Sequence, residues 1–110
     1  MKYTSAVRRE ETIPAPTPIT INAQDIPNPK NASIADNGSV TFNAAHACWL
    51  YFLPTGVFGD SSGILKLATG NNGPFDPGQT NVTVAYCVTG PNTTCTPGLA
   101  GDGGNSIKVG

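Results

Sequence analysis

Few side chains in this sequence could carry chemistry. The chain has one histidine, His46, so a metal site built on several imidazoles is excluded, and a Ser-His-Asp triad would have to use this residue. No Gly-x-Ser-x-Gly motif supplies a nucleophile. We interpret the aspartates as turn residues, because their side chains hydrogen-bond readily to nearby backbone. They are Asp25, Asp36, Asp60, Asp76 and Asp102. We therefore expect no catalytic residues and no enzyme activity.

The chain has three cysteines, Cys48, Cys87 and Cys95. If any two of them form a disulfide, the third remains a free thiol. Cys87 and Cys95 flank the turn-forming Gly-Pro-Asn at 90–92, and they could lie opposite each other across a hairpin. Pairing of Cys48 with either of them, and three free thiols, stay open as alternatives. The cysteine usage and the low charge are typical of extracytoplasmic domains.

Composition limits the size of the domain and the kinds of partner. The chain has 110 residues, which suit one domain with one core. Its net charge of -1 gives no reason to expect nucleic acid or an anionic membrane surface as a partner. No apolar run approaches the roughly 20 residues that span a bilayer. Residues 1–12 lack the apolar segment of a secretory signal, so we expect an extracytoplasmic protein whose leader is absent from this sequence.

The residues that could act must be positioned by β-strands. With 13 Gly and 10 Pro, the chain keeps helical spacing nowhere for long, which disfavours helices. The segment 39–53 alternates at first and then, from Cys48 to Leu53, is apolar on both sides, which predicts a fully buried strand. With this segment counted as two strands, about seven short strands are expected, the pattern of a β-sandwich. The other predicted strands are 19–23, 31–35, 64–69, 79–89 and 106–109.

The connections between these strands contain turn residues. Asn37-Gly38 predicts a tight hairpin that pairs residue 39 onward with Ile34. Loops 55–63 and 70–78 are rich in glycine, and each contains one aromatic residue, Phe58 and Phe75. These two rings either present a contact surface to a partner or fold back as anchors of their loops.

The chain divides into an N-terminal arm and one domain. Residues 1–18 carry no apolar period, and prolines at every second position near the end impose an extended backbone, so we expect a tail or arm. Residues 19–110 form the predicted sandwich. The predicted core is Ile19, Ile21, Val40, Phe42, Trp49, Leu50, Phe52, Leu65, Leu67, Val82, Val84, Tyr86, Val88 and Ile107.

Several segments of the sandwich region resemble the cupredoxins, the small blue-copper β-sandwiches. The last third has Val82 to Tyr86, Cys95-Thr-Pro-Gly, a Gly-rich loop and Gly104-x-x-Ile-x-Val, which is similar to the C-terminal pattern of that family. Upstream, Gly38-Ser-Val-Thr-Phe followed by His46 is similar to the strand that leads to the family's first histidine ligand. The resemblance covers roughly residues 19–109 and implies a Greek-key sandwich.

The copper ligands of that family are only partly present. Leu99 stands where the second histidine is expected, and the chain's single Met is Met1 rather than a residue of the loop. A blue-copper site needs two histidines and a cysteine thiolate. Copper binding or electron transfer through His46 and Cys95 is therefore an alternative, which a disulfide between Cys87 and Cys95 would contradict because it consumes the thiolate.

We predict an all-β, cupredoxin-like Greek-key sandwich without metal or other cofactor. Its expected function is a non-catalytic extracytoplasmic module for binding or structure, with Phe58 and Phe75 facing an unknown protein or surface partner. A second alternative to this function is a self-assembling subunit whose arm, residues 1–18, docks on the next molecule.

Overall fold

The computed structural model describes residues 14–60, 62–98 and 104–110. In these residues the chain forms strands and no helix, so the predicted all-β class is confirmed. The strands are β1 (Thr17–Ile21), β2 (Pro27–Asn28), β3 (Asn31–Ile34), β4 (Val40–Ala44), β5 (Cys48–Leu53), β6 (Ile64–Leu67), β7 (Gly70–Phe75), β8 (Val82–Thr89) and β9 (Asn105–Val109).

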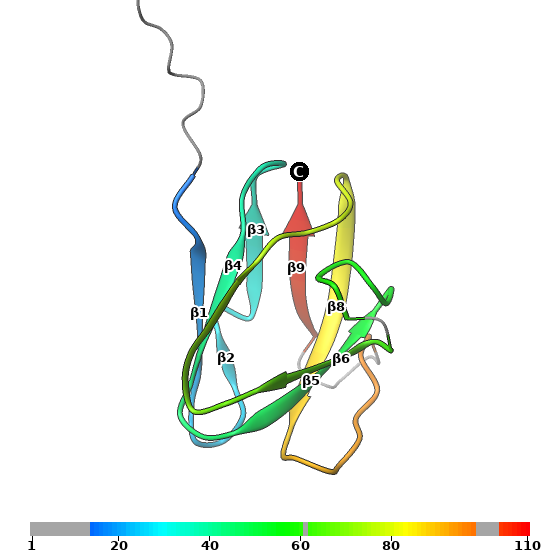
Figure 1. The fold of residues 1–110 in the computed structure, drawn as a ribbon. Helices are drawn as coiled ribbons and strands as arrows, with labels where there is room; N and C mark the ends of the chain where they lie inside the picture. Colours follow the sequence, from blue (N-terminus) through cyan, green and yellow to red (C-terminus); the bar gives the residue numbers. More distant parts are fainter. Residues whose placement is uncertain (1–13, 61, 99–103) are drawn as a thin grey trace, which may run out of the picture.

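The strands form two sheets that pack face to face as a sandwich (Figure 1). The four-stranded sheet has the order β2-β1-β4-β7, and the five-stranded sheet has the order β3-β9-β8-β5-β6. Most neighbours are antiparallel, but β1 pairs with β4 and β3 with β9 in parallel. Strands β2 and β3 follow one another in the chain yet belong to different sheets, so the chain crosses between the layers at Pro29-Lys30.

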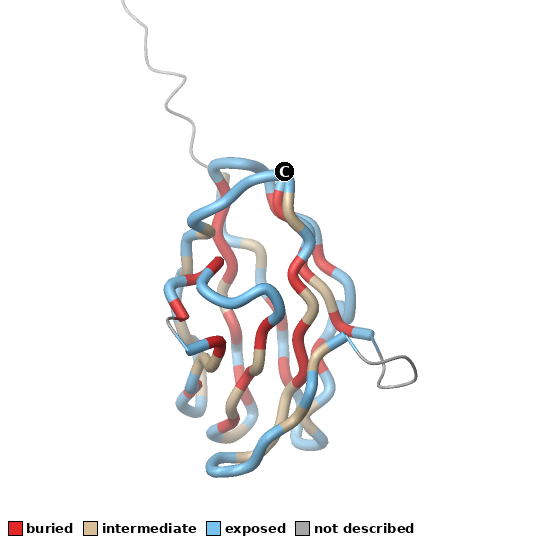
Figure 2. Tube along the Cα trace, turned by 90° about the vertical axis from the view of Figure 1, so that its right-hand side faces the viewer, coloured by how far each residue is buried: buried red, intermediate tan, exposed pale blue. Residues whose placement is uncertain are grey.

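Period-two alternation places one face of each main strand in the interior. Buried and exposed residues alternate along β1, β3, β4 and β9, and the same alternation is visible along the traces in Figure 2. The largest fully buried side chains are Tyr86, Phe42, Ile19, Ile21, Leu50, Ile107, Val40, Val57, Val84, Val109 and Cys48. Burial of each large apolar side chain contributes about 1.5–3 kcal/mol, which makes this interior the main source of stability.

The predicted hairpin at Asn37-Gly38 does not form, although the turn itself does. Gly38 N donates to Ala35 O at 2.9 Å. Strand β3, however, pairs with β9, whereas β4 pairs with β1 and β7. Both strands bury an apolar face in the interior, but β3 belongs to the five-stranded sheet and β4 to the four-stranded sheet. The turn therefore passes the chain from one sheet to the other.

Two further segments differ from the sequence prediction. Residues 70–75, expected in a turn-rich loop, form β7 at the edge of the four-stranded sheet. The Asn72 side chain supports this irregular strand, because its Nδ2 donates to Ala68 O at 2.8 Å and to Phe42 O at 3.3 Å. Residues 93–96, which would form the second strand if Cys87 and Cys95 lay across a hairpin, contain no strand.

The predicted arm overlaps the first strand. Residues 1–13 lie outside the described residues, and β1 already begins at Thr17, within the segment 1–18. Pro18 fits into β1 because β2 pairs only with Thr20 and Ile21, so no neighbour on that side needs the missing N–H of Pro18.

Candidate functional site

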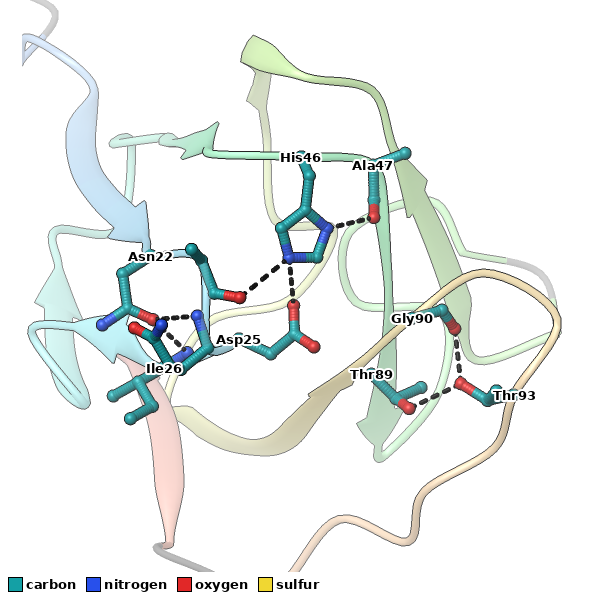
Figure 3. A network of polar contacts seen from close by, with 10 residues as sticks. Asn22, Asp25, Ile26, His46, Ala47, Thr89, Gly90 and Thr93 are labelled. Carbon is teal, nitrogen blue, oxygen red and sulfur yellow. Dashed lines mark hydrogen bonds and ion pairs between the residues drawn. The ribbon is translucent and has the colours of Figure 1, made fainter.

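His46 joins two loops at one end of the sandwich (Figure 3). It lies between β4 and β5, where its Nδ1 is 2.8 Å from Ala47 O. Its Nε2 is 3.2 Å from Ala23 O and 3.2 Å from Asp25 Oδ1, both in the turn between β1 and β2. Because carbonyl oxygens only accept hydrogen bonds, both contacts are made at once by the protonated ring. The carbonyls of Ala47 and Ala23 accordingly raise the pKa of His46, and the charge of Asp25 adds to the effect.

The disulfide between Cys87 and Cys95 confirms the first of the predicted pairings, with a Cα–Cα distance of 6.2 Å. It ties the segment after β8 back onto that strand. Tyr51 in β5 holds the same segment, because its hydroxyl donates to Thr93 O at 2.6 Å. The Thr93 hydroxyl lies 2.6 Å from that of Thr89 and also donates to Gly90 O (Figure 3). These links fix residues 90–98 against β5 and β8, and we call this segment the pinned loop.

The remaining cysteine is a buried thiol. Cys48 is 0% exposed on the inner face of β5. Burial raises the pKa of Cys48 to about 11, with a smaller contribution from the negative charge of Asp25. A thiol with such a pKa stays protonated at neutral pH and is a poor nucleophile and metal ligand.

The residues named for copper do not fit that ion. Cys95 Sγ is bonded to Cys87, so it supplies no thiolate, and both ring nitrogens of His46 already contact oxygen atoms. In residues 14–60, 62–98 and 104–110, no three His, Cys, Asp or Glu residues gather as a metal site would require. Leu99, at the position of the second family histidine, lies outside the described residues.

Of the two roles left open for Phe58 and Phe75, packing against the protein is favoured over contact with a partner. Phe58 is only 4% exposed, and its ring lies 5.6 Å from that of Phe52 between centroids. It therefore anchors its loop in the core and offers no ring to a partner. Phe75 belongs to β7, where it is half-buried and packs 6.1 Å from the Phe42 ring.

A different apolar surface lies on the outer face of the five-stranded sheet, on β5. Cys48, Leu50 and Phe52 are buried in the interior, whereas the alternate residues Trp49, Tyr51 and Leu53 point outward. Leu53 is 56% exposed, and the other two are half-buried. Lys66 of β6 lies opposite Trp49, with its Nζ 4.5 Å from the centroid of the indole ring. We call Trp49, Tyr51, Leu53 and Lys66 the aromatic face.

The sequence prediction missed this surface because it placed Trp49 in the core. A strand that is apolar on both sides is expected to be buried on both sides. Here the second side is covered only in part, by the pinned loop at Tyr51 and by the Lys66 side chain over Trp49. One residue in the sequence does indicate this surface. Lys66 lies between Leu65 and Leu67, and this alternation indicates that one side of β6 faces solvent.

Comparison of the sequence with protein-family models and with curated proteins, and of the structure with solved structures, gave no match. In the part of the chain that the structure describes, no helix is long and apolar enough to cross a membrane. The disulfide is compatible with an extracytoplasmic location.

Proposed function

We propose that this chain is a non-catalytic, extracytoplasmic binding module that holds a protein partner on its aromatic face. The observation that carries the proposal is that Trp49, Tyr51 and Leu53 point outward from one strand, where Leu53 is exposed and the two aromatic side chains are partly exposed. Aromatic residues at a partly covered surface are the side chains that most often dominate protein–protein affinity.

The charges around the aromatic face indicate what the partner carries. The strands of the five-stranded sheet contain two charged residues, Lys66 and Lys108, and no carboxylate. Both lysines are exposed, and Lys108 lies opposite Thr83 on the outward-facing side of β9. A partner with Asp or Glu around an apolar patch would complement this face in both charge and polarity.

The pinned loop supports a binding role by keeping this surface ordered. The Cys87–Cys95 bond and the hydrogen bond from Tyr51 to Thr93 O hold residues 90–98 beside the aromatic face. A surface that is ordered before binding loses less conformational entropy when a partner docks.

We further propose that the sandwich is a cupredoxin-like Greek key that has no copper site. Strand β8 returns past β6 to pair with β5, the kind of return connection that is typical of a Greek key. His46 lies between β4 and β5 and Cys95 between β8 and β9, the places that the resemblance implies for ligands. An experimental structure with a different strand order would contradict this assignment.

The proposed binding function can be tested with a random peptide library displayed on phage. The library is selected on the immobilised, oxidised protein, and enriched peptides are measured by isothermal titration calorimetry. We expect peptides that combine aromatic or aliphatic residues with Asp or Glu. Their affinity should fall at least about tenfold with Trp49→Ser and with Lys66→Glu, because these changes remove the apolar contact and reverse the local charge.

Asn43→Ser is the matched control, because Asn43 is an exposed strand residue of the other sheet. It should leave the affinity of the selected peptides unchanged. Peptides that bind all variants equally well would overturn the proposal. So would a wild-type dimer, detected by light scattering, that Trp49→Ser converts to a monomer, because the aromatic face would then hold a second copy of the chain.

A further inference from the structure

A small cavity lies between the turn that joins β1 to β2 and the facing parts of β8 and β9. Its volume is about 160 Å³. Cavities of about 150 Å³ hold molecules of the size of benzene, so this one is large enough for a small organic ligand. Its lining residues are Asp25, Ile26, Pro27, Lys30, Cys87, Val88 and Asn105.

Two of the lining residues carry buried oxygen atoms that can accept a hydrogen bond from a ligand. Asn105 precedes Ile107 on the inward-facing side of β9 and is only 9% exposed, and its Oδ1 has no hydrogen-bond partner. The Oδ1 of Asp25 is also buried without a directed hydrogen bond. His46 Nε2 lies 3.2 Å from that oxygen as an ion pair, and a carboxylate oxygen can accept a further bond. Buried polar groups are normally paired, so the unpartnered Asn105 Oδ1 favours a ligand that donates, and Asp25 Oδ1 can accept from the same donor group.

Lys30 adds a positively charged hydrogen-bond donor to the same cavity. Its ammonium group offers three donors, and among the described residues it forms no ion pair with a carboxylate. The apolar part of the cavity lining consists of Ile26, Pro27 and Val88. A ligand that satisfies all of them has an ammonium group, a carboxylate and a short apolar side chain.

We propose that this cavity binds a free α-amino acid with a small apolar side chain. Its ammonium group donates to Asp25 Oδ1 and Asn105 Oδ1, and its carboxylate accepts from Lys30. The side chain packs against Ile26, Pro27 and Val88. The cavity and the aromatic face share no residue, and neither proposal depends on the other.

L-valine is the probe that tests the site, measured by NMR titration and calorimetry of the full chain. We expect saturable chemical-shift changes at Ile26 and Val88. Isobutylamine keeps the ammonium group and isobutyrate keeps the carboxylate, and each should bind at least about tenfold more weakly than L-valine because each satisfies one end of the cavity. The Lys30→Gln variant should lose at least about tenfold in affinity for L-valine.

Lys108→Gln is the matched control, because it removes an exposed lysine that lies outside the cavity. It should bind L-valine as the wild type does. Because Lys30 is exposed, Lys30→Gln should fold normally. The proposal is overturned if L-valine gives no saturable shifts, if either single-charge analogue binds equally well, or if Lys30→Gln and Lys108→Gln behave alike.

Discussion

At the scale of single residues, two tyrosine hydroxyls of the five-stranded sheet have opposite surroundings. The Tyr51 hydroxyl donates to Thr93 O at 2.6 Å. The Tyr86 ring packs against those of Phe42 and Phe52, and its buried hydroxyl has no hydrogen bond to any described residue. Burial raises the pKa of Tyr86, because the ionised form would be poorly solvated there. The same chemical group is therefore favourable in one position and costly in the other.

Removing the two hydroxyls should shift stability in opposite directions. We expect Tyr86→Phe to raise the free energy of unfolding by up to about 1 kcal/mol, because it removes a buried polar group that has no partner. Tyr51→Phe should lower it by about 1 kcal/mol, because it leaves Thr93 O without its donor. Urea unfolding followed by the fluorescence of Trp49 measures both. A loss of stability in Tyr86→Phe would show that its hydroxyl does have a partner.

At the scale of elements, the loop of residues 90–98 is held by covalent and polar links rather than by strand pairing. The disulfide attaches it to β8, and Thr93 contacts β5 and β8 through Tyr51 and Thr89. The two sheets bury their apolar faces independently of this loop. The loop should therefore detach without loss of the sandwich.

Replacing both Cys87 and Cys95 with serine should lower the free energy of unfolding by about 2 to 3 kcal/mol, the value for closing so short a loop in the unfolded chain. The circular dichroism spectrum should keep its β character. The same variant serves as control for reduction: dithiothreitol should destabilise the wild type and leave the variant unaffected. Equal destabilisation of both proteins would contradict the assigned bond.

At the scale of the whole molecule, Cys48 reports on the integrity of both sheets. Its side chain is fully buried on β5, within the apolar cluster that both sheets share. Its pKa of about 11 further suppresses the reactive thiolate.

We expect iodoacetamide to label Cys48 only after global unfolding. The labelling rate in urea should follow the population of the unfolded protein measured by fluorescence. The disulfide-bonded cysteines provide an internal control, because they should remain unlabelled without a reductant. Rapid labelling of the native protein would contradict the structure, since it would place Cys48 within reach of solvent.

Most strands could be predicted because their side chains alternate with period two. β4 and β8 are examples, and the buried residues Val40, Phe42, Val84 and Tyr86 were expected from this pattern. β7 could not be predicted, because Gly-Asn-Asn-Gly-Pro-Phe has no such alternation. Its place in the sheet comes from pairing with β4, about thirty residues earlier in the chain, and from the amide of Asn72.

The candidate sites were predictable to different degrees. Cys87 and Cys95 were one of the open pairings, favoured by the turn between them. The aromatic face was not predicted, because apolar residues on both sides of β5 are compatible with full burial as well as with an exposed patch. The cavity was also beyond prediction, because Lys30 and Asn105 are far apart in the sequence and meet only when β9 pairs with β3.

By itself, the sequence determined the all-β class, the positions of most strands and the residues able to form a disulfide. These properties follow from local alternation, from Gly and Pro, and from cysteine spacing, all of which act over a few residues. Only the tertiary structure decided that β3 and β4 lie in different sheets, that Phe58 is buried and that Trp49 is partly exposed. These properties depend on which apolar surfaces cover one another. That is decided by segments far apart in the sequence, when the two sheets pack together.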